Sequence, residues 1–209
     1  TEYNDASKRD GAAIDWDRER GRIQVLQFKS GELHGPARVF TESGELMFEQ
    51  MYEDGKAQGH KREWARSGWM KLDMSYSNDV PVGTRRMWSD PCRLSQVDQW
   101  KQGKLHGLQR MWHSYPRQLK ERANFKAGAR DGLSETWNQV GLLIRKHEHE
   151  AGKRHGESSG WFPNSQRAFE TYWFKGRPDK GARAWHTSGA PALRGRYSKG
   201  QKLSLSCFD

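Results

Sequence analysis

The chain carries the stretch GKLHGLQRMW at residues 103–112, in which two glycines precede a tryptophan by nine and by five positions. An aromatic residue returns at the same point every 24 residues, with one step of 25. These positions are Trp16, Phe40, Trp64, Trp88, Trp112, Trp137, Trp161 and Trp185. A period that persists through the chain indicates a repeat array, in which each unit buries its apolar side only against its neighbours.

Glycines mark two turns in each 24-residue unit, since glycine reaches positive φ without a Cβ penalty. Two turn zones leave two strands of roughly six to eight residues, which is a typical strand length. Met70, Leu72, Met74 and Tyr76 alternate along the chain as one face of a strand should. The sequence therefore predicts an all-β fold, an elongated, twisted, single antiparallel sheet of about eight tandem 24-residue β-hairpins with almost no helix.

The repeats predict one domain over residues 1–209. The units fall at approximately 4–27, 28–51, 52–75, 76–99, 100–124, 125–148, 149–172 and 173–196, with a closing strand at 197–209. Only 33% of the residues are hydrophobic, which is too few to fill a thick two-layer core. Most of the burial must therefore come from the aromatic side chains, each of which can remove about 150 to 250 Å² from water.

The repeat unit resembles the MORN-repeat variant family, which is found in bacterial YwqK-type antitoxin-like proteins. Residues 31–35 (GELHG) and 103–107 (GKLHG) are its best matches, and the resemblance covers residues 4–209. It implies a long twisted antiparallel sheet that serves as a binding or scaffolding surface without catalysis. The chain departs from the family pattern at five glycine positions, where it has Asp79, Cys92, Pro116, Ser165 and Lys180.

An arginine stands two residues before the aromatic position in five units, at Arg38, Arg62, Arg86, Arg110 and Arg183. Residues two apart share a strand face, so a guanidinium could stack on the indole as a cation–π pair. The stripe can be interpreted as a grip for an anionic partner, or as arginine stems that cover tryptophan edges with their charged ends in water. The predicted partner-binding residues are Arg62, Arg86, Trp88, Arg110, Trp112, Arg183 and Trp185.

Positive charge is concentrated late in the chain. Residues 1–80 carry 12 Lys and Arg against 15 Asp and Glu, whereas residues 81–209 carry 24 against 11, which together give the net +10. A basic extended surface speeds association with an acidic partner, which can be a protein, a nucleic acid or lipid head groups. A solubilising surface without a target is the other interpretation.

The sequence argues against catalysis and against a metal centre. His34, His106 and His155 share one repeat position, but at roughly 9.6 Å per hairpin they lie about 19 Å or more apart, far beyond the reach of a shared metal. His147 and His149 face one way on a strand, but two ligands make a weak site. No nucleophile elbow, phosphate loop or paired-carboxylate signature occurs. We expect no enzyme, cofactor, metal or small-molecule substrate.

Two further features bear on the compartment. Cys92 and Cys207 lie between four and five repeats apart, so they are not expected to pair with each other. No run of 18 apolar residues and no signal peptide is visible. Because the chain begins at Thr1, we expect an upstream segment to have been removed. The resemblance favours the periplasm or cell envelope, with the cytoplasm as the alternative.

Two functions are compatible with these features. The first is an antitoxin or immunity protein that binds a cognate toxin or secreted effector and blocks it. The alternative is a membrane-associated scaffold whose basic surface docks on anionic lipid. A nucleic-acid role ranks third, because tryptophans beside basic residues could stack on bases but no recognised nucleic-acid motif is present.

Overall fold

The structure is a computed structural model that describes the backbone of residues 2–3 and 8–208 and the side chains of residues 8–208. Residues 4–7, at the start of the first predicted repeat, lie outside the described part. The chain divides into two compact units, which we call unit 1 (residues 1–104) and unit 2 (residues 105–209).

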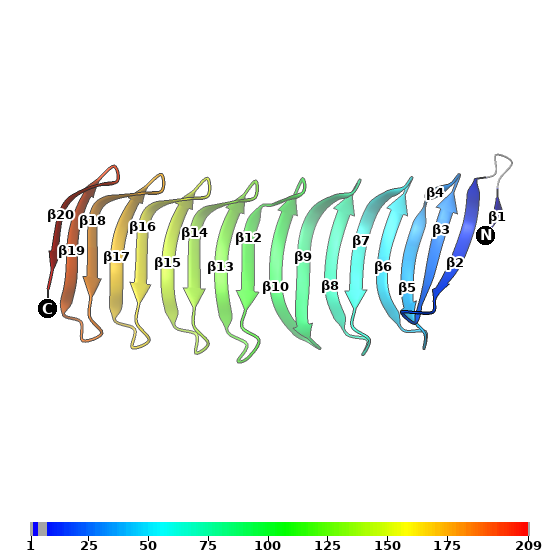
Figure 1. The fold of residues 1–209 in the computed structure, drawn as a ribbon, viewed down its shortest axis with the longest axis horizontal. Helices are drawn as coiled ribbons and strands as arrows, with labels where there is room; N and C mark the ends of the chain where they lie inside the picture. Colours follow the sequence, from blue (N-terminus) through cyan, green and yellow to red (C-terminus); the bar gives the residue numbers. More distant parts are fainter. Residues whose placement is uncertain (1, 4–7, 209) are drawn as a thin grey trace. The chain divides into compact units, whose positions relative to one another are not determined.

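Unit 1 is an open antiparallel sheet in which strands adjacent in sequence pair with each other (Figure 1). The short strand β4 adds a brief pairing to β3. Its strands are β1 (Glu2–Tyr3), β2 (Arg9–Asp17), β3 (Arg22–Lys29), β4 (Glu32–Leu33), β5 (Gly35–Thr41), β6 (Leu46–Glu53), β7 (Lys56–Trp64), β8 (Met70–Ser77), β9 (Val80–Asp90) and β10 (Arg93–Lys101). The two-residue β11 (Lys104–Leu105) spans the boundary between the units.

Unit 2 follows the same plan, again with each strand antiparallel to the next along the chain. Its strands are β12 (Gly107–Trp112), β13 (Leu119–Lys126), β14 (Ala129–Trp137), β15 (Leu143–Glu150), β16 (Lys153–Trp161), β17 (Arg167–Phe174), β18 (Arg177–Trp185), β19 (Pro191–Ser198) and β20 (Gln201–Cys207). The described residues contain strands, turns and bends but no helix, so none of them forms a helix that could cross a membrane. The prediction of an all-β fold made of antiparallel hairpin repeats is confirmed.

From residue 28 onward, the first turn of each repeat is a two-residue loop with positive φ at both positions, as in Ser30 (51°) and Gly31 (88°). Such loops match the twist of the flanking strands and favour glycine at the second position. The second residue also donates its backbone N–H to a carbonyl of the preceding repeat, as from Gly31 to Arg9 (2.8 Å). The equivalent bond recurs through both units, for example from Gly152 to Arg130 (2.8 Å). Each turn is therefore anchored to the repeat before it.

Four of the five departures from glycine keep the positive φ that glycine has in the other units. Positive φ angles occur at Asp79 (65°), Cys92 (63°), Ser165 (66°) and Lys180 (58°). Pro116 lies in a turn that is closed by a bond from the His113 N–H to the Gln118 carbonyl (3.0 Å). Asp79, Cys92 and Ser165 thus lie in turns or bends and Lys180 lies within β18, each with a side chain in a region that L-residues enter at some cost.

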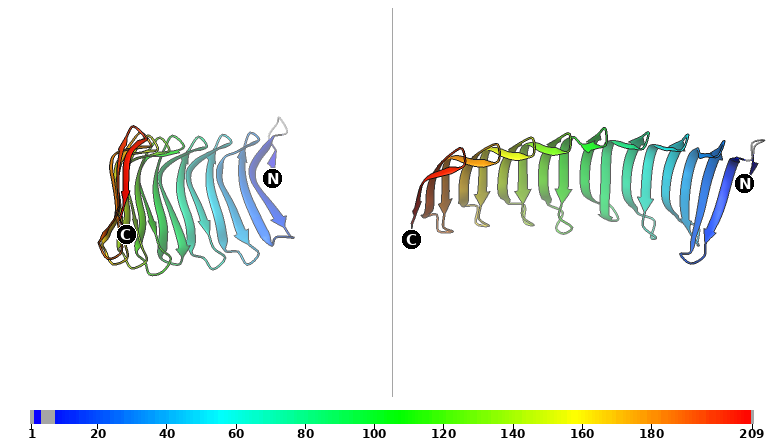
Figure 2. Two further views of the ribbon diagram at one scale, coloured as in Figure 1. Left: turned by 60° about the vertical axis from the view of Figure 1, so that its left-hand side comes forward. Right: turned by 45° about the horizontal axis from the view of Figure 1, so that its top comes forward.

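Each unit is a single layer, and no described element covers either face of its sheet (Figure 2). Few side chains are fully buried in consequence. The buried apolar residues are Ala37, Met74 and Ala123, and the buried polar ones include Gln50, Asp98, Gln109, Ser134 and Ser158. Asp98 is fully buried in unit 1, where Arg85 Nε donates to its Oδ2 at 2.6 Å. Polar partners therefore occupy much of the interior.

Candidate functional site

The predicted arginines of unit 1 lie in one row of cross-strand partners. From β3 to β10 the row reads Val25, Arg38, Glu49, Arg62, Asp73, Arg86 and Val97. Every basic residue in it has at least one acidic neighbour. Opposite charges placed directly across a strand pair stabilise a sheet, whereas like charges destabilise it.

Carboxylates of the chain itself hold the arginines of the unit 1 row. Arg38 Nε donates to Glu49 at 2.9 Å, and Arg62 lies 3.9 Å from Glu49 and 3.5 Å from Asp73. Arg86 also approaches Asp73, at 3.7 Å. Arg62 and Arg86 are both predicted to bind a partner. Both approach the Asp73 carboxylate, so their charge is partly neutralised within the sheet.

The corresponding row of unit 2 is different. From β12 to β20 it reads Arg110, Arg122, Glu135, Lys146, Ser159, Glu170, Arg183, Arg194 and Ser206. Arg122 donates to Glu135 (2.8 Å), and Arg167 engages Glu170 (2.9 Å). Within residues 8–208, Arg110, Arg183 and Arg194 form no ion pair. We call these three the open arginines.

The net formal charges of the two units differ as their rows do. Residues 1–104 contain 17 Lys and Arg and 17 Asp and Glu, so their net charge is zero. Residues 105–209 contain 19 against 9, which accounts for the whole +10 of the chain. The positive charge of the protein therefore belongs to unit 2.

The expected stacking of each arginine on the tryptophan two residues later does not occur. In the described part of the chain, no cation–π contact joins Arg62 to Trp64, Arg86 to Trp88, Arg110 to Trp112 or Arg183 to Trp185. Arginines from adjacent strands contact other indoles instead, as Arg122 does at 5.8 Å from the Trp137 ring centroid and Arg167 at 5.6 Å from that of Trp161. In unit 1 the reason is plain, because the row arginines reach sideways to carboxylates on neighbouring strands.

The structure does not gather the predicted residues of unit 2 into one cluster. Arg110 and Trp112 are on β12, whereas Arg183 and Trp185 are on β18, six strand spacings or roughly 29 Å away. Trp112 and Trp185 are half-buried, as is Trp88 in unit 1. A partner that touches both ends of the unit 2 row must therefore cover most of the sheet.

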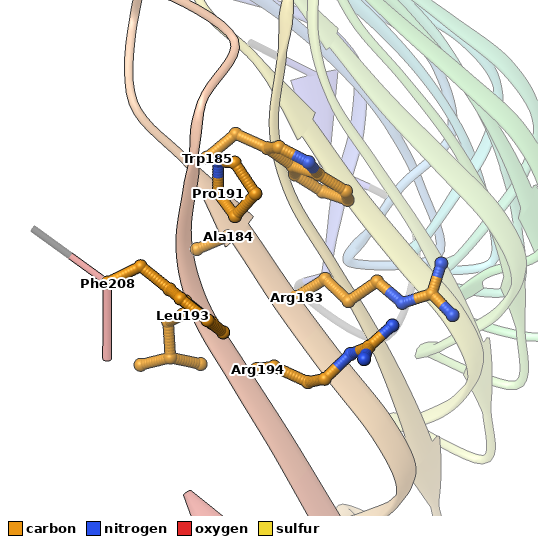
Figure 3. A pocket seen from close by; sticks show the side chains of 7 residues that line it. All are labelled: Arg183, Ala184, Trp185, Pro191, Leu193, Arg194 and Phe208. Carbon is orange, nitrogen blue, oxygen red and sulfur yellow. The ribbon is translucent and has the colours of Figure 1, made fainter. Parts of the chain in front are cut away.

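Arg183 and Trp185 line a hollow of about 340 Å³ in unit 2 (Figure 3). The other residues that line it are Ala184, Pro191, Leu193, Arg194 and Phe208. Figure 3 shows the Arg183 and Arg194 side chains extending in the same direction with their guanidinium groups close together, and the Trp185 indole on the same side. Sequence reasoning missed Arg194, Pro191, Leu193 and Phe208. Arg194 could have been found from spacing. Row partners across the second turn are mostly 11 residues apart, as are Arg38 and Glu49, and Arg194 follows Arg183 by 11.

His147 and His149 lie on one face of β15, as predicted. Burial, and then the positive charge of Arg154, lowers the pKa of His147 from 6.5 to about 4. Burial and Arg130 likewise lower the pKa of His149. Surrounding arginines repel a cation, and residues 8–208 hold no group of three or more His, Cys, Asp or Glu placed to bind a metal ion. Cys92 and Cys207 are free, exposed thiols.

No protein-family model and no curated protein matches this chain. The resemblance to MORN-repeat variants therefore stays a prediction.

Proposed function

We propose that the chain is a non-catalytic repeat protein of the MORN-variant type that binds an acidic partner protein through unit 2. The partner is a toxin or secreted effector, which the chain neutralises in the periplasm or cell envelope. The observation that carries the proposal is the set of open arginines, in the unit that holds the whole +10.

The charge of unit 2 suits recognition of an acidic protein surface. A surface of one sign raises the encounter rate with an oppositely charged partner, and arginines without intramolecular partners are available for new ion pairs. A protein interface of standard size covers roughly 800 Å² on each side. A row that crosses nine strands in unit 2 offers that extent on one sheet.

A neutralisation assay tests the proposal. Candidate toxins encoded beside the gene are expressed with and without the chain, and both growth and complex formation are measured. We expect one candidate to arrest growth, and the chain to relieve the arrest and bind with an affinity that falls as salt rises. If no neighbouring product binds the chain or is neutralised by it, the proposal is wrong.

Two triple variants distinguish recognition by the row arginines from attraction by net charge alone. Reversal of the open arginines (Arg110→Glu, Arg183→Glu, Arg194→Glu) should reduce affinity at least a hundredfold, at about tenfold or more per lost charge-assisted contact. Reversal of Lys126, Lys153 and Lys199, which are exposed near turns, makes the same charge change away from the row. Equal losses in both variants would contradict recognition by the row.

Anionic lipid is the alternative occupant, favoured by the same +10 on one unit. Co-sedimentation with vesicles of phosphatidylcholine alone and with 30% phosphatidylserine distinguishes the two. We expect weak binding that the open-arginine and control triple variants lose equally, because a diffuse lipid charge does not read individual positions. Tight binding that only the open-arginine variant loses would favour the membrane scaffold over the antitoxin.

A further inference from the structure

The hollow beside Trp185 places two arginines directly opposite each other. Arg183 on β18 and Arg194 on β19 are cross-strand partners, and both side chains are exposed. Like charges in this relation destabilise a sheet. The other adjacent arginine pair of the unit 2 row, Arg110 and Arg122, does not line this hollow.

Nothing in the described chain neutralises this arginine pair. The row neighbour on one side is Glu170, whose carboxylate is engaged by Arg167 at 2.9 Å. The neighbour on the other side is Ser206, which carries no charge. The pair is thus a concentrated positive charge whose mutual repulsion a bound anion would relieve.

Apolar residues also line the hollow, and the Trp185 indole lies on the same side as the two guanidinium groups (Figure 3). Trp185, Pro191, Leu193 and Phe208 line the same hollow, and the Phe208 residue is 44% exposed. The backbone holds Phe208 in place, because its N–H donates to the Ala192 carbonyl (3.0 Å) and its own carbonyl lies 3.3 Å from His186 Nε2. The hollow therefore combines two unpaired cations with apolar and aromatic side chains.

We propose that this hollow binds an acidic segment of the partner protein in which a carboxylate side chain stands next to a bulky apolar side chain. Two guanidinium forks can hold one carboxylate through parallel N–H···O bonds, and the adjacent apolar group packs on the tryptophan side. Arginine and tryptophan are also the residue types that dominate binding energy at protein interfaces. The proposal rests on the function proposed above and assigns the contact point within it.

The test uses the full chain with ¹⁵N-labelled arginine and monitors the Nε–H signals of Arg183 and Arg194. The probe is a short acetylated, amidated peptide with one glutamate followed by phenylalanine. We expect it to shift both signals in a saturable manner. Replacing its glutamate by glutamine should weaken binding at least tenfold, and replacing its phenylalanine by alanine should weaken it about tenfold.

Matched variants locate the contact. Arg183→Gln and Arg194→Gln should each weaken peptide binding about tenfold. Arg196→Gln is the control, because Arg196 is exposed on the same strand two residues from Arg194 and does not line the hollow. The absence of shifts, an equal loss with Arg196→Gln, or tighter binding of phenyl phosphate than of the peptide would each overturn the proposal.

The outcomes also separate this proposal from the proposed function. If the chain neutralises a toxin but neither single variant affects the peptide or the toxin, the hollow proposal is wrong and the function stands. If the peptide binds as expected but no acidic protein partner does, the hollow proposal stands and the antitoxin function is wrong.

Discussion

Units 1 and 2 are built from the same hairpin repeat, yet they use the same arginine position differently. In unit 1 each row arginine has an acidic cross-strand neighbour: Glu49 for Arg38, Glu49 and Asp73 for Arg62, and Asp73 for Arg86. In unit 2 the partner of Arg183 is Arg194. A repeat position therefore has no fixed role: the charges of its cross-strand neighbours decide whether the arginine pairs within the sheet or stays without an ion pair.

The largest expected effect concerns the buried charge of unit 1. Asp98 is fully buried, and both Arg85 and Gln96 donate to its carboxylate. Asp98→Ala leaves the Arg85 charge without this partner and should lower the free energy of unfolding by about 3 to 5 kcal/mol in urea titrations. Asp90→Ala is the control, because Asp90 pairs with Arg93 (3.4 Å) at a more exposed site and should cost less than about 1 kcal/mol. Similar losses in both would show that burial does not matter here.

Close packing constrains the backbone of unit 2 at Gly160. A Cβ at Gly160 would overlap the Phe169 ring, which stacks on His147 with centroids 6.4 Å apart. Gly160→Ala should therefore lower the free energy of unfolding by about 1 to 3 kcal/mol. At Gly181 a Cβ meets nothing within 4 Å and φ is not positive, so Gly181→Ala should be neutral or slightly stabilising. Thermal unfolding of the two variants checks this contrast.

Acid should weaken unit 2 through its histidine pair. Folding lowers the pKa of His147 to about 4, so the unfolded chain takes up the proton first as pH falls. The contribution to stability is therefore complete above pH 6.5 and is lost between pH 6.5 and about 4. Allowing for partial exposure, the loss is about 1 kcal/mol.

His147→Asn should reduce this loss, as measured by urea titrations at pH 7 and pH 4.5. His149, Arg130, Arg145 and Arg154 all disfavour the protonated form and remain in the variant. An unchanged pH dependence would assign the effect to other groups.

The smallest effect is a gain. Arg194→Glu replaces a like-charge pair by opposite charges across β18 and β19, and should raise the free energy of unfolding by about 0.5 to 1 kcal/mol. The same variant should lose the glutamate–phenylalanine peptide. Asp73→Asn does the reverse in unit 1, because it removes the shared partner of Arg62 and Arg86 and should lower stability. A loss of stability in Arg194→Glu would refute this explanation of the row.

Glycine spacing was enough to predict the hairpins, because φ at the turns is a local property of the chain. The structure shows the same for four residues that replace glycine. Asp79, Cys92, Ser165 and Lys180 adopt the same positive φ as the glycines they replace. Periodicity therefore predicted these turns more reliably than residue identity did.

The partners of the arginines could not be predicted from alternation along one strand. Alternation placed Arg183 and Trp185 on one face but did not identify Arg194 or Phe208, which depend on register between strands. The register also slips by one residue before most of the tryptophans, as between Glu63 and Trp64 opposite β8. Such bulges change cross-strand neighbours without changing the period.

The bond from each two-residue turn to a carbonyl 22 or 23 residues earlier bears on how this protein can change length. Every such bond joins the same two positions of consecutive repeats, so gain or loss of a whole repeat by gene duplication or deletion leaves each bond matched. Gain or loss of half a repeat would place a two-residue turn beside a part of the preceding repeat that lacks the matching carbonyl. Duplication can therefore lengthen the sheet in increments of one hairpin, and so enlarge the surface that it would offer to a partner of the kind proposed above.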